Sequence, residues 1–201
     1  MDEIKDVLKD IFLFKNADEV VEKTEFSAPK TFGKGEEIYN ADTFEKSIGV
    51  IIKGKAKATT LSGDVFLTRF SRGDLFGAAA VFGENKEYIS KIVADRDCTV
   101  QFIEQEKLAF LFEKYPVISI NYISFLSSKI RFLNEKLAIM MQDGVEGRIY
   151  AYLLKNDGYD GKMTALADTL CIGRTSLYRS LEALENKNLI VRNDGKIKVI
   201  L

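Results

Sequence analysis

Residues 163–190 read MTALADTLCIGRTSLYRSLEALENKNLI, and this stretch decides the fold of the C-terminal region. Apolar residues recur at helical spacing in both of its halves, which predicts a short helix over 164–170 and a longer one over 174–186. Between them Cys171-Ile172-Gly173 predicts a tight turn, and the small Ala167 lets the two helices approach closely. Two short helices joined in this way are typical of a helix-turn-helix.

The residues that follow predict a β-hairpin. The stretch LIVRNDGKIKVIL, residues 189–201, contains two β-rich runs joined at Asn193-Asp194-Gly195, and Asp-Gly is a strong signal of a type I′ turn. A hairpin after a helix-turn-helix makes a winged helix. The preceding stretch GVEGRIYAYLLKND, residues 144–157, predicts a helix that ends near Gly158.

The exposed face of the second helix carries the candidate chemistry. Leu177, Leu181 and Leu184 form its expected buried face. The candidate DNA-binding residues are the polar ones at its start, namely Arg174, Thr175, Ser176, Tyr178 and Arg179. A guanidinium can bind guanine with two hydrogen bonds, and hydroxyls can contact phosphates or bases. On an isolated helix such arginines would be solvated charges, but at the start of a recognition helix they are expected to contact DNA.

A long helix is expected over 116–142, with Pro116 at its first position. Its apolar residues follow steps of three and four, as in a coiled-coil seam: Ile123, Leu126, Ile130, Leu133, Leu137 and Met140. An amphipathic helix lying on its own sheet would show the same pattern. A second apolar stripe, Ile118, Tyr122, Phe125 and Phe132, favours burial on two sides. We therefore expect one stripe to face the N-terminal domain and the other to form a symmetric dimer contact.

The N-terminal region has a different pattern, in which short β-rich runs are separated by glycine or charged turns. These runs are SIGVIIKG, KAKATTL, VFLTRF, SKIVA and CTVQFI, between residues 47 and 103. Many short strands of this kind predict a jelly roll. Helices are expected over 3–14 and 105–115. The predicted fold class is therefore α+β, with a jelly-roll or double-stranded β-helix domain over 1–115, a dimerisation helix over 116–142 and a winged helix over 143–201.

Composition excludes most enzyme classes. The chain has no histidine, and its two cysteines, Cys98 and Cys171, lie 73 positions apart. Common zinc sites, Ser-His-Asp triads and Cys-His dyads are thereby excluded. We therefore expect no enzyme and no cofactor. A catalytic site made of carboxylates alone is the one kind that this composition still allows. The 29 basic and 30 acidic residues exclude a polybasic tail protein. No apolar run reaches the length of a membrane span, and the acidic N-terminus has no signal-peptide core, which predicts a cytoplasmic protein.

On these residues the chain resembles the Crp/Fnr transcription regulators over essentially its whole length. The stretch GRTSLYRSLEALENKNLI, residues 173–190, is similar to the recognition-helix signature of that family. The resemblance implies that Arg174 and Arg179 are its two DNA-contacting arginines. Thr175 stands where the family has a glutamate that reads cytosine, and this departure leaves the half-site sequence open.

A second stretch, RGDLFGAAAVFGENKEYISKIVADRDCTVQFI, residues 72–103, is similar to the phosphate-binding cassette of the family. In its cyclic-nucleotide binders a glutamate takes the ribose hydroxyl and an arginine takes the cyclic phosphate. The matching positions here are Ala78 and Tyr88, and a buried phosphate without its cation is costly, so we expect a different, partly apolar effector. The expected pocket comprises Phe76, Gly77, Ala78, Ala79, Ala80, Tyr88 and Ser90, with Tyr122, Phe125 and Lys129 of the long helix.

The resemblance implies a homodimeric regulator that reads an inverted repeat in double-stranded DNA, with a small-molecule effector and RNA polymerase as further partners. Two alternatives stay open. One is an effector-binding module that acts through protein contacts, and the other is a regulator in which Ala78 to Ala80 only pack a core and no effector exists. An iron–sulfur cluster needs several clustered cysteines, and histidine-ligated haem is excluded, whereas haem ligation by Met or Cys and a redox role of Cys171 stay open.

Overall fold

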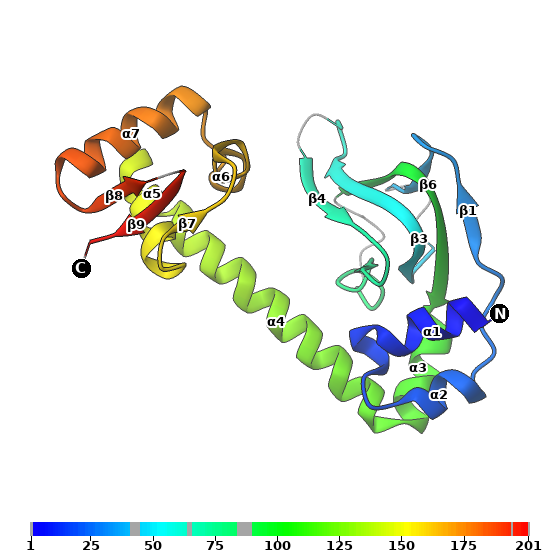
Figure 1. Cartoon of the computed structure of the whole chain (residues 1–201). Coiled ribbons are helices and arrows are strands. Elements are labelled where there is room, and N and C mark those ends of the chain that lie inside the picture. The colour runs from blue at the N-terminus through cyan, green and yellow to red at the C-terminus, as the bar shows by residue number, and fades with distance from the viewer. Residues whose placement is uncertain (1, 41–44, 64–65, 84–89, 194, 201) are drawn as a thin grey trace. The chain divides into compact units, whose positions relative to one another are not determined.

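The computed structural model describes residues 2–40, 45–63, 66–83, 90–193 and 195–200, and the chain divides into two compact units, Met1–Ser128 and Lys129–Leu201 (Figure 1). The boundary between the units falls within one helix, α4 (Pro116–Met140). The finer division at residues 115 and 142 stays a prediction.

The first unit contains an antiparallel sheet. Its strands are β1 (Lys30–Phe32), β2 (Glu37–Tyr39), β3 (Ser47–Thr60), β4 (Phe66–Phe70), β5 (Leu75–Phe76) and β6 (Ser90–Glu104). The paired order is β1-β6-β3-β4, with β2 also paired to β6 and β5 to β3. The long, bent β3 and β6 run side by side in Figure 1 and form the centre of the sheet.

The expectation of separate short strands is wrong for these two central strands. The runs SIGVIIKG and KAKATTL form the single strand β3, and SKIVA and CTVQFI lie in the single strand β6. Gly54 has φ +86° inside β3, and the register with β6 shifts at Lys53 and again at Lys55. A Cβ at this glycine would lie 2.1 Å from the carbonyl oxygen of Asp97, so only glycine fits. The glycine therefore marks a bulge that bends the strand without ending it.

Short helices cover one face of this sheet. They are α1 (Asp2–Asp10), the 3₁₀ turn η1 (Phe12–Phe14), α2 (Asp18–Lys23) and α3 (Gln105–Lys114). The single helix expected over 3–14 is wrong, because α1 ends at Asp10, and α2 was not predicted. The fully buried side chains Leu8, Phe14, Leu108, Leu111 and Ile118 pack against Ile48 and Val50 of β3. The first half of β3 is buried on both faces for this reason.

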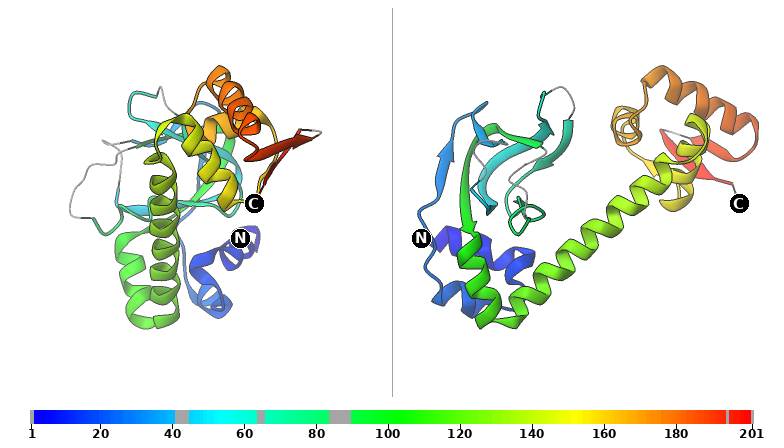
Figure 2. Two further views of the ribbon diagram at one scale, coloured as in Figure 1. Left: turned by 90° about the vertical axis from the view of Figure 1, so that its left-hand side faces the viewer. Right: turned by 180° about the vertical axis from the view of Figure 1, so that it is seen from behind.

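The second unit contains the helices α5 to α7 and a small sheet, which Figure 2 shows in yellow to red. Its elements are α5 (Gly144–Lys155), β7 (Tyr159–Asp160), α6 (Met163–Leu170), α7 (Arg174–Asn186), β8 (Ile190–Asn193) and β9 (Lys196–Val199). The helices α6 and α7 and the hairpin of β8 and β9 agree with the expected elements. The strand β7, which pairs with β9, was not predicted. The core of this unit contains Ile149, Leu153, Leu166, Leu170, Leu177, Leu181 and Ile197.

Candidate functional site

The turn between α6 and α7 is a left-handed helix end. Cys171 has φ 53° and ψ 46°. Its N–H donates to the carbonyl of Asp168 at 3.2 Å, and the N–H of Ile172 donates to the carbonyl of Ala167 at 3.0 Å, as in a Schellman motif. Gly173, expected to suit the turn, has an ordinary φ of −67° and precedes α7 as its N-cap. The residue that carries the unusual backbone is therefore Cys171.

The start of α7 presents a polar face to solvent. Leu177, Leu181 and Leu184 are buried in the core of the second unit. At 100° per residue, Thr175, Tyr178 and Arg179 share the side opposite the three leucines, whereas Arg174, the first residue of the helix, projects beside Leu181 on the flank of that side. All four side chains are exposed, and Ser176, on the other flank, is half-buried. The structure thus places three of the five predicted DNA-binding side chains on one face, with Arg174 at its edge.

The two exposed arginines at the start of α7 differ from the other basic side chains around this helix. Several of those are paired with carboxylates at 2.6 Å: Lys187 with Glu146, Arg192 with Glu185, and Lys196 with Asp160. Neither Arg174 nor Arg179 forms an ion pair with any side chain in the described part of the chain. Their guanidinium groups are therefore available to an anionic partner.

The wing, which is the hairpin of β8 and β9, is hydrogen-bonded to the C-terminal end of α7 through one carboxylate. Glu185 Oε2 accepts from Arg192 Nη2 at 2.6 Å and from Nε at 2.9 Å, and Glu185 Oε1 accepts from the Arg192 backbone N–H at 3.1 Å. The side-chain hydrogen bond from Arg192 lowers the pKa of the Glu185 carboxyl. Sequence reasoning missed this pair, because helix and strand spacing do not show which residues meet across a connection.

The predicted effector region is densely packed around Ala78. The hydroxyl of Tyr122, on α4, donates to the carbonyl oxygen of Ala78 at 2.6 Å, and burial raises the pKa of Tyr122 to about 12. The rings of Phe82 and Phe112 lie 5.8 Å and 5.0 Å from the Tyr122 ring. The phenol stays neutral near pH 7 and acts here as a hydrogen-bond donor. The two predicted pocket residues Ala78 and Tyr122 therefore do meet.

Phe76 belongs to a different cluster, in the interior of the sheet. Its ring packs on Tyr39, Phe70 and Phe102, with centroids 5.4 Å, 5.6 Å and 6.3 Å away. A Cβ at Gly49 would lie 2.1 Å from this ring. Aromatic side chains thus fill this part of the interior of the sheet.

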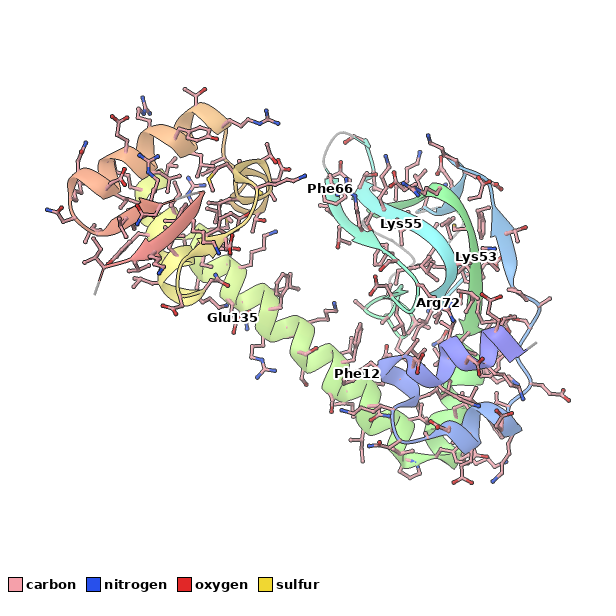
Figure 3. The ribbon with its side chains drawn as sticks, viewed as in Figure 1. Phe12, Lys53, Lys55, Phe66, Arg72 and Glu135 are labelled. Carbon is pink, nitrogen blue, oxygen red and sulfur yellow. The ribbon has the colours of Figure 1, made fainter. Side chains whose placement is uncertain are left out.

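The other predicted pocket residues are dispersed. Gly77 is buried, Ala80 and Ser90 are half-buried, and Ala79 and Lys129 are exposed. Phe125 is half-buried beside Phe12, whose ring centroid is 5.9 Å away and which Figure 3 labels. Tyr88 lies outside the described residues.

The predicted dimer seam is largely exposed. Ile123, Ile130, Leu133 and Leu137 expose between 56% and 61% of their surface. Leu126 and Met140 are half-buried against the cores of the first and second units, respectively. In the second stripe Ile118 and Tyr122 are buried, as expected for contact with the N-terminal domain, whereas Phe132 is 59% exposed. A row of large exposed apolar side chains is typical of a contact surface.

Within the described residues, no group of three or more His, Cys, Asp or Glu side chains is placed to hold a metal ion. None of the described helices combines the length and the apolar character that crossing a bilayer requires.

Comparison with known proteins supports the fold. Residues 29–115 match the cyclic nucleotide-binding domain family. No curated protein matches the chain significantly.

Solved structures match along nearly the whole chain. The catabolite activator protein of Thermus thermophilus is 19% identical, with 94% of this chain and 93% of that chain covered and a TM-score of 0.54. The c-di-GMP responsive global regulator CLP of Xanthomonas campestris is 16% identical, with coverage of 88% and 95% and a TM-score of 0.57. A CooA mutant from Carboxydothermus hydrogenoformans is 15% identical, with coverage of 90% and 89% and a TM-score of 0.58. The predicted fold is thereby confirmed, and two of these three proteins are an activator and a regulator.

Proposed function

We propose that the chain, which has the fold of the Crp/Fnr transcription regulators, is a homodimeric, sequence-specific DNA-binding regulator that responds to a small molecule other than a cyclic nucleotide. Double-stranded DNA with an inverted repeat is its first partner and a second copy of the chain its second. RNA polymerase as a further partner, and a cytoplasmic location, stay predictions.

The observation that carries the DNA-binding proposal is the exposed face at the start of α7. Arg179 lies there with Thr175 and Tyr178 on the side opposite the buried leucines, and Arg174 is exposed in the first turn at the edge of that side. The second helix of a helix-turn-helix enters the major groove with its N-terminal residues foremost. Arginines in that position can donate two hydrogen bonds each to guanine O6 and N7. A protein-contact module would not need this arrangement of donors.

The test measures binding to an inverted repeat selected from random duplex DNA, by fluorescence anisotropy at several salt concentrations. Arg174→Ala and Arg179→Ala are each expected to cost roughly 1–3 kcal/mol on the selected site and to relax the base preference. The control is Lys53→Ala, an exposed lysine of β3 labelled in Figure 3, which should leave the base preference unchanged.

Two outcomes would correct the assignment. If either arginine variant weakens binding to all sequences equally, that arginine contacts phosphate and does not read a base. If no duplex is bound, or binding does not weaken with salt, the protein-contact module becomes the better description, since phosphate contacts make DNA binding salt-dependent.

The effector part of the proposal is supported by the chemistry of the cassette. Ala78 has no charged group, and its carbonyl oxygen already accepts a hydrogen bond from the buried hydroxyl of Tyr122. Neither Ala78 nor Tyr122 offers a cation to a phosphate at neutral pH. Calorimetric titration with cyclic AMP and cyclic GMP is therefore expected to show no micromolar binding, and native mass spectrometry of the purified protein is expected to find a small co-purified molecule. Micromolar binding of either nucleotide would contradict this part.

A further inference from the structure

A cavity of about 200 Å³ lies within the second unit, among the C-terminal part of α4, α5 and the end of α6. Its floor is apolar and consists of Ile139, Met140, Tyr152 and Leu170, all buried or half-buried. Its rim consists of Phe132, Lys136, Lys155, Asn156 and Thr169. The cavity thus combines an apolar floor with two ammonium groups at its edge.

The charges around the cavity leave one positive charge in excess. Lys155 is paired with Glu135, a residue of α4 that Figure 3 labels. Lys136 is half-buried, and within the described ranges it forms no ion pair. Two ammonium groups and one carboxylate therefore suit an occupant with a single negative charge. An ammonium has three donors, so Lys155 can keep Glu135 and still bind a second acceptor.

The other two polar side chains of the rim, Asn156 and Thr169, each donate a hydrogen bond to a backbone carbonyl of their own helix region. Asn156 Nδ2 donates to the Tyr152 carbonyl at 2.7 Å, and Thr169 Oγ1 donates to the Ala165 carbonyl at 2.7 Å. Each of these groups thus spends a donor on the backbone, and the two lysines, which carry a full positive charge, are the rim groups best suited to an anion.

The volume limits the size of an occupant. The cavity volume is about 200 Å³, whereas pockets for drug-sized ligands span about 300–1,000 Å³. The cavity therefore suits one ring or a short chain with one charged group.

We propose that this cavity binds a small monocarboxylate whose apolar ring or chain lies on Ile139, Tyr152 and Leu170. Its carboxylate contacts the ammonium groups of Lys136 and Lys155. Leu170 is the last residue of α6, and the turn at Cys171 follows it directly, so the occupant touches the first helix of the helix-turn-helix. Such a ligand would connect α4 with the DNA-reading part of the chain. This site is distinct from the effector region around Ala78, and its occupancy does not depend on whether the chain binds DNA.

The test uses the full chain and two probes, phenylacetate and hexanoate, with methyl NMR to follow Ile139, Met140 and Leu170. We expect saturable shifts of these methyl signals with both acids. The neutral phenylacetamide should bind more weakly, by up to about fivefold, because a partly exposed ion pair is worth up to about 1 kcal/mol. Lys136→Gln should raise the Kd for phenylacetate by a similar factor.

Two further variants complete the experiment. Lys162→Gln changes an exposed lysine of the same unit that does not line the cavity, and it should leave the Kd unchanged. Thr169→Trp fills the cavity from its exposed rim and should abolish the shifts, while an unchanged thermal unfolding midpoint shows that the variant folds. The proposal is wrong if neither acid shifts these methyl signals, if the amide binds as tightly as the acid, or if Thr169→Trp folds and binds normally.

Discussion

At the scale of single residues, Cys171 carries strained backbone in the turn of the helix-turn-helix. Its φ of 53° is left-handed, a conformation that costs an L-residue roughly 1–2 kcal/mol and glycine almost nothing. The side chain is exposed, so replacing it removes no core contact. Cys171→Gly is therefore expected to raise the free energy of unfolding by about 1 kcal/mol, measured by chemical denaturation. Cys171→Ser keeps the strain and should change little; a loss of stability in the glycine variant would contradict this explanation.

At the scale of elements, the Glu185 carboxylate connects the end of α7 with β8. The hydrogen bonds from Arg192 lower the pKa of the carboxyl in the folded chain below its ordinary value of 4.5. The folded chain therefore binds this proton less readily than the unfolded chain does. The stabilisation is complete above the unfolded pKa and is lost as the pH falls through the lower folded pKa.

Glu185→Gln removes the charge of this carboxylate and should therefore change how stability depends on pH. The variant should have a lower free energy of unfolding than the parent chain at neutral pH. This difference in free energy should become smaller as the pH falls below 4.5. Denaturant unfolding across this range measures it. Glu182→Gln, an exposed position on the same helix, is the matched control and should follow the parent curve. A constant difference at all pH values would show that packing, and not the charge, holds the wing.

At the scale of the whole molecule, the exposed stripe of α4 predicts the assembly state. Ile123, Ile130, Leu133 and Leu137 expose more than half of their surface, which favours a parallel helix pair between two copies. Leu133→Lys would bury a charge in that contact and should yield monomers in analytical ultracentrifugation. Phe110→Lys changes a similarly exposed apolar residue of α3 and should leave a dimer intact. A monomeric parent chain would rule out the dimer.

Elements that depend on local spacing could be predicted from the sequence alone. The long helix, the helices α6 and α7 and the hairpin of β8 and β9 follow from apolar periodicity, capping and turn residues that lie a few positions apart. The exposed polar face of α7 follows for the same reason, because a helix with one leucine stripe must turn its other side to solvent. Three of the five residues predicted for DNA contact, Thr175, Tyr178 and Arg179, lie together on that account.

Features that join distant residues could not be predicted from local spacing and are seen in the folded chain. Whether Gly54 ends a strand or bends it depends on the backbone of Asp97, 43 positions away. The hydrogen bond from the Tyr122 hydroxyl to the Ala78 carbonyl joins residues 44 positions apart. The cavity beside Lys136 is formed by side chains from three helices. Spacing along a chain predicts which side of an element is apolar, but it does not specify the partner that this side meets. Close packing selects that partner, because each void or clash in the folded interior costs free energy that only the assembled neighbours determine.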